Sequence, residues 1–464
     1  MKPREKWGSK LGFLMATAGS AIGLGSLWKF PYVTGENGGG FFVLAYLIFT
    51  FLIGVPIFTA ELMIGRTGGG APVGTFGELS GLHKSWRFLG WSCVLATLLV
   101  LSYYSVVAGW ALNYVLMSLM HFTQGKTPEE IANVFDLLYS AGDINLLWNF
   151  LFLALTTGIV YGGIRKGIEF WSKILTPALL ISLLALFLYA LTLKGFPRAF
   201  FFIFTPDASR LSPSGLLEAL GLACFTLSVG MGIILTYGSY MHKNDDIPKT
   251  SFTVASMTIL VSLLAALMIF PIIFTFNFTP QEGPGLLFKT LPVLFSKLPA
   301  TLLLSTTFFG LVVFAALTST ISVMEVLVAT VTEVFGWSRA RGVLIVGGIV
   351  FILGIPSALS GSGGIFVQWK QMYGKNFFSS VDYFTTTWLL PINVILTAIF
   401  SGWIIERSRR SQGFLEGTHL RWLFRPWLFL VRWIVPLGIL LIVLQQGGVI
   451  NLDKWLGWIW HKEH

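Results

Sequence analysis

The amino-acid sequence predicts an all-α membrane protein with about 11 transmembrane helices. Of the 464 residues, 55% are hydrophobic and only 11% are charged, whereas soluble domains carry roughly 25% charged residues. The mean hydropathy is +0.76. Apolar runs of about 20 residues, the length needed to cross a bilayer, recur along the chain. These observations exclude a soluble enzyme, a nucleic-acid-binding protein and a disordered chain.

Eleven apolar segments are the candidates for these helices. The segments near 147–163 and 341–356 are short, so the number could differ by one. The end of the chain after residue 446 holds several Trp and is expected to lie at the membrane interface. The predicted spans are 11–34, 41–65, 88–120, 147–163, 169–192, 215–240, 250–277, 300–334, 341–356, 378–405 and 427–446.

Eleven crossings place the two termini on opposite sides of the membrane. Twenty of the 31 Lys and Arg residues then fall on the side of the N-terminus. Because cytoplasmic loops are enriched in Lys and Arg, we expect a multi-pass protein of the cell membrane with its N-terminus in the cytoplasm and its C-terminus outside. The net charge of +10 thus reflects basic cytoplasmic loops and does not indicate nucleic-acid binding.

The cysteines and histidines give no sign of a metal or catalytic centre. Cys93 and Cys224 lie in apolar runs and are expected to be buried thiols. The six His residues lie outside the long apolar segments and show no spacing typical of metal ligands. An enzyme embedded in the membrane is therefore disfavoured.

Two predicted spans interrupt their own helical pattern with glycines. Residues 19–26 read GSAIGLGS and residues 225–232 read FTLSVGMG, although Gly costs about 1 kcal/mol relative to Ala inside a helix. Small residues also occur where membrane helices pack closely. Here, however, the glycines alternate with Ser and Thr, and they occupy the first and sixth spans.

The position of these interruptions predicts two inverted five-helix repeats with discontinuous helices 1 and 6. The repeats would cover about 8–192 and 213–410, followed by helix 11 and the tail, 411–464, within one transmembrane domain that spans 1–464. An unwound helix offers backbone carbonyls to a cation and amides to an anion. The sequence therefore predicts a site for a solute and an ion near the middle of the membrane.

Several motifs resemble those of one transporter family. They are Arg4-Glu5-Lys6-Trp7 with GSAIGLGSLWKFPYVTGENGGGFF, the run from Glu61 to Arg66, Tyr103-Tyr104, FTLSVGMG with TYGSY, ALTSTIS and VDYFT. In these motifs the chain resembles the neurotransmitter:sodium symporter family, in particular its prokaryotic amino-acid carriers with the leucine-transporter fold. The resemblance covers essentially the whole chain. It implies sodium-coupled secondary active symport by alternating access, with spans one, two, six and seven rocking against the others.

The resemblance implies a pocket for an amino acid. Tyr104 would bind the substrate carboxylate together with backbone amides of the first break. Gly23 would leave room for that carboxylate, where amine carriers of the family have an acidic residue. The side-chain end has no fixed charge, which favours a neutral, apolar amino acid. The implied lining is Ser20, Ala21, Gly25, Val100, Tyr104, Phe225, Thr226, Ser228, Met231, Ser319 and Val323.

The resemblance also implies one or two Na⁺ ions. The second sodium site of the family would use carbonyls or hydroxyls of Gly19, Ile22, Ala315, Thr318 and Ser319, and neutral oxygen ligands suit a hard cation. The first sodium site would use Ala21, Ser26, Thr226 and Thr258. Ser26 and Thr258 stand where the family has Asn, so this site is expected to be weak, rearranged or lost.

The need for chloride stays open. The family's chloride site would use Tyr46, Thr226 and Ser262, but its Gln is replaced by Leu222. This difference favours a defective site.

Charged and aromatic residues would form two gates. Lys29 and Asp382 match an outer Arg–Asp pair, and Lys offers a point charge where Arg offers a fork, so a softer or water-mediated gate is expected. On the inner side, Arg4 would pair with Glu333, helped by Trp7 and Tyr240.

Two carboxyl groups lie inside apolar spans, where such groups are functional by default. Glu61 is expected to hold the unwound sixth span by accepting hydrogen bonds from the backbone of that span. Glu325 would have similar structural work or a proton role.

Two other functions stay open beside sodium symport. A non-transporting amino-acid sensor would keep the pocket and lose the gates or ion sites, and the replacements at Ser26, Lys29 and Thr258 give it some weight. A proton-coupled carrier would use Glu61 or Glu325. The partners implied are a small amino acid and the lipid bilayer, without nucleic acid, and the oligomeric state is not indicated.

Overall fold

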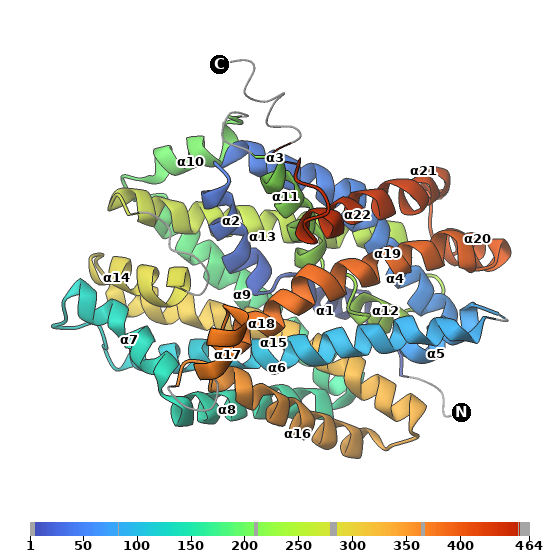
Figure 1. Cartoon of the computed structure of the whole chain (residues 1–464), viewed down its shortest axis with the longest axis horizontal. Coiled ribbons are helices and arrows are strands. Elements are labelled where there is room, and N and C mark those ends of the chain that lie inside the picture. Colours follow the sequence, from blue (N-terminus) through green and yellow to red (C-terminus); the bar gives the residue numbers. More distant parts are fainter. Residues whose placement is uncertain are drawn as a thin grey trace.

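The computed structural model describes residues 5–81, 83–207, 212–278, 285–362, 367–452 and 454. In these ranges the regular structure is entirely helical, and the long helices run side by side along the longest axis of the molecule (Figure 1). Nine described helical spans are long and apolar enough to cross a membrane. Two further spans, the first and the sixth, are interrupted, so the predicted architecture of about eleven crossings is confirmed.

The crossings are built from single helices or from two helices, which are joined by irregular backbone in the sixth crossing and include a π-helical turn in the others. In chain order they are α1 (Lys10–Ala21) with α2 (Phe30–Glu36); α3 (Gly40–Phe49) with α4 (Val55–Gly68); α6 (Arg87–Leu119); α8 (Gly142–Tyr161); α9 (Phe170–Ala190); α11 (Pro213–Thr226) with α12 (Ile233–Ser239); α13 (Ile247–Thr275); α15 (Thr301–Val334); α16 (Arg339–Ala358); α18 (Phe377–Tyr383) with α19 (Leu390–Ile399); and α21 (Phe424–Phe429) with α22 (Val435–Gln446).

Shorter helices lie in the connections between the crossings. The two spans predicted to be short are full-length, because α8 and α16 each have 20 residues. The predicted interfacial tail beyond residue 454 lies outside the described residues. The connecting helices are α5 (Pro72–Leu79), α7 (Pro128–Ser140), α10 (Phe196–Phe204), α14 (Leu291–Ser296), α17 (Val367–Tyr373) and α20 (Arg407–Leu415).

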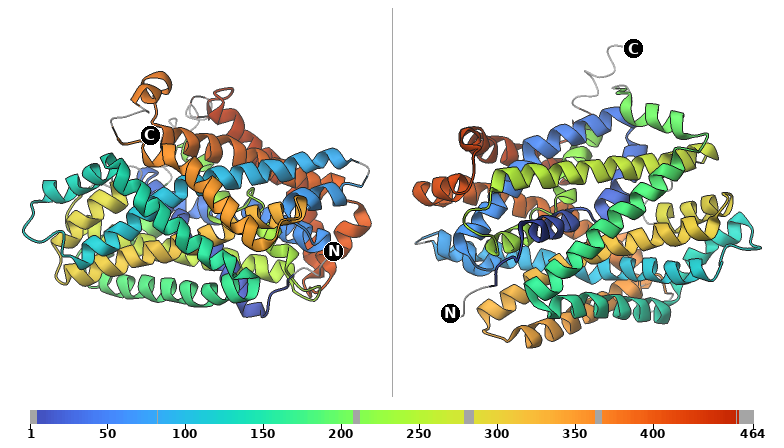
Figure 2. Two further views of the ribbon diagram at one scale, coloured as in Figure 1. Left: turned by 90° about the horizontal axis from the view of Figure 1, so that it is seen from below. Right: turned by 180° about the vertical axis from the view of Figure 1, so that it is seen from behind.

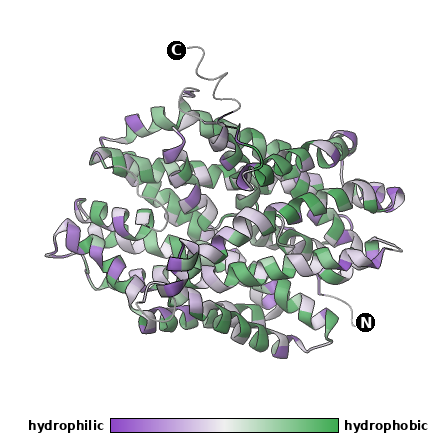
Figure 3. Cartoon of the chain, viewed as in Figure 1, coloured by the Kyte–Doolittle hydropathy of each residue, from purple (hydrophilic) through white to green (hydrophobic). Residues whose placement is uncertain are grey.

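Burial differs strongly between the spans and defines a centre and a periphery. The most apolar stretch of α15 is 94% buried, whereas that of the last span is 28% buried. α15 packs against α1, α6 and α9 in the middle of the molecule. Figure 3 shows apolar residues along the middle of the helices and polar residues gathered toward their ends, as expected for a chain that crosses a bilayer.

Close packing of α4 on α12 depends on small residues. A Cβ atom on Gly65 would lie 1.9 Å from the Leu235 carbonyl oxygen, and one on Gly238 would lie 2.7 Å from that of Leu62. Only glycine permits this approach of the two backbones, and small residues play this role widely in membrane helices. The second span is thereby fixed to the second half of the broken sixth span.

One end of the molecule holds the N-terminal segment and is called here the N-terminal face. The Lys6 ammonium donates to the carbonyls of Ser239 and Met241, at 3.1 and 2.8 Å. Arg66 donates to the carbonyls of Asp245 and Gly413, which joins α4 to the loop after α12 and to α20. Figure 1 shows α5 and α20 at this end and α7 and α14 at the other. Figure 2 shows from behind how α1 lies against α9.

Candidate functional site

Both predicted helix breaks are present. α1 ends at Ala21, and after Ile22 (φ −86°, ψ 70°) the chain continues through a π-helical turn, Gly25–Lys29, into α2. The two halves of this first span are bent by 49°. In the sixth span, six residues of irregular backbone separate α11 from α12. Ser228 within them has a positive φ of 55°, a conformation that is uncommon outside glycine and typical of functional sites.

The backbone of the second break is held through the peptide groups of Gly230. Its N–H donates to Glu61 Oε1 at 2.6 Å, and its carbonyl accepts from Asn393 Nδ2 at 2.9 Å. Ser92 in turn donates to Asn393 Oδ1 at 2.6 Å. Irregular backbone within a membrane needs such partners. The predicted role of Glu61 is therefore seen in the geometry, whereas Asn393 and Ser92 were not predicted.

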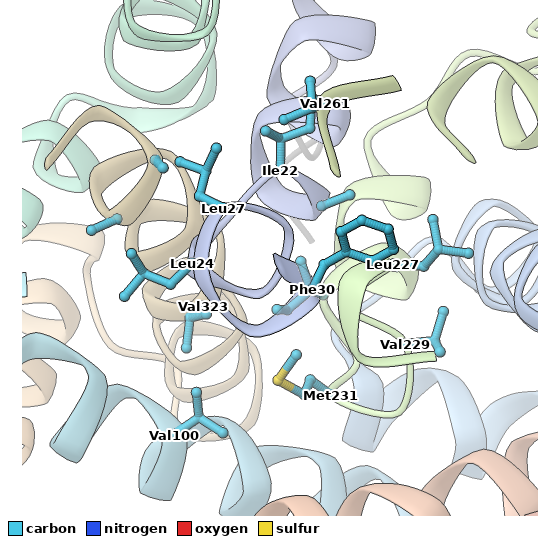
Figure 4. Packing of buried hydrophobic residues seen from close by; sticks show 14 of the residues in the cluster. Ile22, Leu24, Leu27, Phe30, Val100, Leu227, Val229, Met231, Val261 and Val323 are labelled. Carbon is cyan, nitrogen blue, oxygen red and sulfur yellow. The ribbon is translucent and has the colours of Figure 1, made fainter. Parts of the chain in front are cut away.

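A small cavity lies between the two breaks. The space open to the centre of a water molecule is about 40 Å³, enough for a few waters. All eleven predicted pocket residues line it, together with Gly23 and Leu24. Figure 4 shows Val100, Met231 and Val323 approaching one another from three different elements beside the loop of the first break.

The cavity has a polar corner near the first break. The Tyr104 hydroxyl accepts from the Leu24 N–H at 3.1 Å. A Cβ atom on Gly23 would lie 2.4 Å from Ser319 Oγ and 3.2 Å from the Tyr104 hydroxyl, so only glycine keeps this corner open. The Ser20 carbonyl accepts from the hydroxyls of Ser228 and Ser319, at 3.1 and 3.2 Å.

The predicted members of the second sodium site meet where α1 ends against α15. A Cβ atom on Gly19 would lie 3.1 Å from that of Thr318, and the Thr318 hydroxyl donates to the Ala315 carbonyl at 3.0 Å. Ile22 caps the C-terminal end of α1, where helix carbonyls lack intrahelical partners. A set of neutral oxygens fits a hard monovalent cation.

The first sodium site keeps one unsatisfied group. Ser26 Oγ is buried and has no hydrogen-bond partner within the described chain, which is rare for a buried hydroxyl and fits an oxygen ligand for a cation. The Thr258 hydroxyl donates to the Val254 carbonyl at 2.9 Å, which leaves its lone pairs available.

Hydroxyl groups of the predicted chloride site also lie together. The Tyr46 hydroxyl is 3.0 Å from Thr226 Oγ1 and 3.5 Å from Ser262 Oγ. Leu222 stands one helical turn before Thr226 and accepts from it only through the backbone carbonyl, at 2.9 Å. Its side chain adds no donor to this group.

A larger vestibule adjoins the cavity at the ring of Phe225. Phe225 lines both spaces, and the vestibule has a volume of about 270 Å³. The Lys29 ammonium lies 4.6 Å from the centre of the Phe225 ring. Lys29 and Asp382 form no ion pair within 4.0 Å, and a gate between them stays a prediction. The vestibule was not predicted.

The path is closed more firmly toward the N-terminal face. Trp7 is only 1% exposed; its indole N–H donates to the Tyr237 carbonyl at 3.1 Å, and its backbone N–H to that of Tyr240 at 3.2 Å. Arg4, the predicted partner of Glu333, lies outside the described residues. Glu333 itself accepts from the Ala71 N–H at 2.7 Å, at the start of α5.

Two further carboxylates support this closure. Glu325 is fully buried, accepts from the Tyr240 hydroxyl at 2.7 Å and pairs with Arg339, an arrangement that supports the structural alternative for this residue. Glu169, which was not predicted, accepts from the Gly8 N–H at 2.6 Å and from the Ser9 hydroxyl at 2.8 Å. Glu169 directly precedes α9 and is far from the N-terminal segment in the sequence, so the two come together only when the chain folds.

Comparison with known proteins identifies the family. The family model described as "Sodium:neurotransmitter symporter family" matches residues 4–133 and 129–455. An uncharacterized sodium-dependent transporter of Bacillus subtilis, YhdH, is 37% identical over 96% of this chain and 98% of its own length. A sodium-dependent dopamine transporter of Caenorhabditis elegans is 25% identical over 90% of this chain and 77% of its own.

A solved structure is similar in fold and sequence. The crystal structure of MhsT in complex with L-phenylalanine has a TM-score of 0.87 and 39% identity, covering 96% of this chain and all of MhsT. These likenesses confirm a sodium-dependent, multi-pass secondary transporter rather than an enzyme. The chain belongs to the sodium:neurotransmitter symporter family.

Proposed function

We propose that the protein imports a neutral, apolar amino acid together with Na⁺ by alternating access. The cavity between the two helix breaks is the observation that supports this most directly, because it joins a polar corner to an apolar end. The Leu24 N–H and the Tyr104 hydroxyl suit a carboxylate, and the Ser20 carbonyl suits an ammonium group. Val100, Met231 and Val323 suit an apolar side chain.

The relative MhsT has been crystallised with L-phenylalanine, which makes this amino acid a rational first probe. Met231 is flexible and can adapt to side chains of different size. We therefore expect L-leucine and L-phenylalanine to be better substrates than L-alanine, and L-lysine and L-glutamate to be excluded, since the lining offers no charged partner.

Transport in this proposal depends on Na⁺ and not on chloride. The unsatisfied Ser26 hydroxyl and the oxygens around Thr318 support sodium sites. The hydroxyls of Tyr46, Thr226 and Ser262 lie together, but Leu222 does not supply the fourth polar group of a chloride site. Partnering of Glu325 with Arg339 makes a proton role for this carboxyl unnecessary.

The test is uptake of radiolabelled L-phenylalanine and L-leucine by proteoliposomes. We expect accumulation only with an inward Na⁺ gradient, and equally with sodium chloride or sodium gluconate. Uptake that continues undiminished in choline buffer would contradict sodium coupling. Binding without accumulation or counterflow would instead indicate a sensor.

A pair of hydroxyl deletions links the uptake to the cavity. Tyr104→Phe removes the hydroxyl that faces the Leu24 N–H and is expected to reduce affinity at least tenfold. Tyr161→Phe removes an exposed hydroxyl, which does not line the cavity, and should change affinity less than threefold. Equal effects of the two variants would contradict the assigned carboxylate site.

A further inference from the structure

Two arginines, one from the connecting helix α20 and one from the last span, donate to the same carbonyl group on the N-terminal face. Arg410 of α20 donates to the Gly402 carbonyl at 2.7 Å, and the Nε of Arg432 donates to the same oxygen at 2.8 Å. A Cβ atom on Gly402 would lie 3.0 Å from Arg432 Cγ, so the small residue lets the arginine lie across the end of the tenth span. Arg407 lies in α20 one turn before Arg410, and its positive charge acts on that of Arg410. These three arginines are called here the arginine cluster.

The cluster has no counter-charge of its own within the described residues. Glu406 pairs with Arg409 at 3.7 Å, and no described carboxylate forms an ion pair with Arg407, Arg410 or Arg432. Burial, together with the positive charges of Arg432 and Arg407, lowers the pKa of Arg410. Paired or neutralised charges are the rule for buried ionised groups.

One atom of the cluster also lacks a hydrogen-bond partner. Arg410 is 4% exposed, and its Nε is buried without a partner in the described chain. Arg432 uses only its Nε, so its two terminal nitrogens have no partner among the described residues. One buried unsatisfied donor and two accessible guanidinium nitrogens, beside positive charges that have no carboxylate partner, indicate an anion, and guanidinium matches phosphate in geometry.

The surroundings indicate which anion this is. Trp403 and Trp433 lie edge to face with their ring centres 5.7 Å apart, and the Arg432 guanidinium lies 5.9 Å from the centre of the Trp403 ring. Both tryptophans are exposed, at 42% and 54%, as is Phe429 at 56%. The last span is the least buried of the candidate spans. A free phosphate would use none of this apolar surface, whereas a lipid would use both parts.

We propose that the arginine cluster binds the head-group phosphate of an anionic phospholipid, whose acyl chains lie along Trp403, Trp433 and Phe429. Basic pockets between spans next to exposed tryptophans suit such lipids. The bound lipid joins the end of the tenth span to the start of the eleventh. This inference concerns a surface away from the cavity and does not depend on the identity of the transported solute.

The full-length protein in detergent tests this with three probes: dioleoyl-phosphatidylglycerol, dioleoyl-phosphatidylcholine and sn-glycerol 3-phosphate. Phosphatidylglycerol is expected to remain attached in native mass spectrometry and to raise Tm by several degrees, while the other two do neither. Equal retention and equal shifts for both lipids would overturn the proposal. A shift of the same size with glycerol phosphate would show a small-anion site and overturn it as well.

Matched arginine variants locate the binding. Arg432→Gln and Arg407→Gln should each weaken phosphatidylglycerol binding roughly fivefold, the effect of about one arginine near a membrane surface. Arg341→Gln is the control, because Arg341 also lies over a tryptophan, 5.2 Å from the Trp337 ring centre, without belonging to the cluster. Arg407 is exposed, so its variant should fold. Equal loss in the control, or unchanged binding in both cluster variants, would refute the assignment.

Discussion

The two sides of the central cavity are closed in different ways. Toward the N-terminal face, Trp7 is buried and hydrogen-bonded, and Lys6 and Gly8 of its segment donate to the loop after α12 and to Glu169 directly before α9. Toward the other face, the ring of Phe225 lines both the cavity and a vestibule of about 270 Å³. The N-terminal side is thus closed by a hydrogen-bonded, buried segment, whereas on the other side the ring of Phe225 borders an open vestibule.

The energies of the two closures differ accordingly. A net hydrogen bond contributes about 1 kcal/mol, and the segment 5–9 makes several to other elements. The contact of Lys29 with Phe225 is a cation–π interaction worth about 0.5–2 kcal/mol. We infer that opening toward the vestibule costs less than opening toward the N-terminal face.

Removal of Trp7 should have the largest effect on this difference. Replacing a buried Trp by Ala costs about 3–5 kcal/mol, and here the cost falls on the state that is closed at the N-terminal face. Trp7→Ala is expected to reduce Na⁺-driven uptake more than tenfold. It should also slow labelling of Cys224, which lines the vestibule, by a membrane-impermeant thiol reagent, measured in a Cys93→Ala background.

The control for this variant is Trp422→Ala, because Trp422 is 71% exposed. It should leave both uptake and the labelling of Cys224 within twofold of the parent. Unchanged labelling in Trp7→Ala would show that the N-terminal segment does not set the balance between the two closures.

Breaking the aromatic layer should have an intermediate effect. Phe225→Ala joins the cavity to the vestibule, so bound amino acid should dissociate about tenfold faster, because loss of affinity usually appears in the dissociation rate. The measurement is release of radiolabelled L-phenylalanine from purified protein in Na⁺. Phe225→Tyr keeps a ring over the cavity and should retain slow release; rapid release from both variants would argue against a role as partition.

Strengthening the weak side should have the smallest effect. Lys29→Arg supplies a planar fork that can bind a carboxylate through two hydrogen bonds, and Asp382 is the expected partner. Release of bound amino acid is predicted to slow two- to threefold. The gain should vanish in the double variant with Asp382→Asn, and a gain that persists there would exclude this pairing.

The sequence predicted the cavity better than the groups that support it. Glycines in the first and sixth spans mark the breaks by themselves, and the residues around Val100 and Ser319 belong to recognisable motifs. Asn393 is a single polar residue in an apolar run, and Glu169 lies among charged residues at the start of a predicted span. Their partners, Gly230 and Gly8, lie more than 160 positions away, and no local pattern indicates which backbone groups such residues will meet.

The ends of the helices show the same limit. The predicted span 147–163 omits the first turn of α8, because Asp143 and Asn145 make this turn look polar. In the folded chain Asn145 is buried and accepts from the Trp110 indole at 2.9 Å. A polar residue can thus extend a membrane helix when another span supplies its partner.

The two peptide groups of Gly230 have a consequence for motion. The N–H is held from the second span through Glu61, and the carbonyl from the tenth span through Asn393. If spans one, two, six and seven rotate as one body, this glycine is attached to the rotating part and to the stationary part at once. Either the rotation axis passes close to Gly230, or the bond to Asn393 breaks once in each cycle. In the second case, the isotope-edited infrared band of the Gly230 carbonyl would shift once in each transport cycle, when its hydrogen bond to Asn393 breaks.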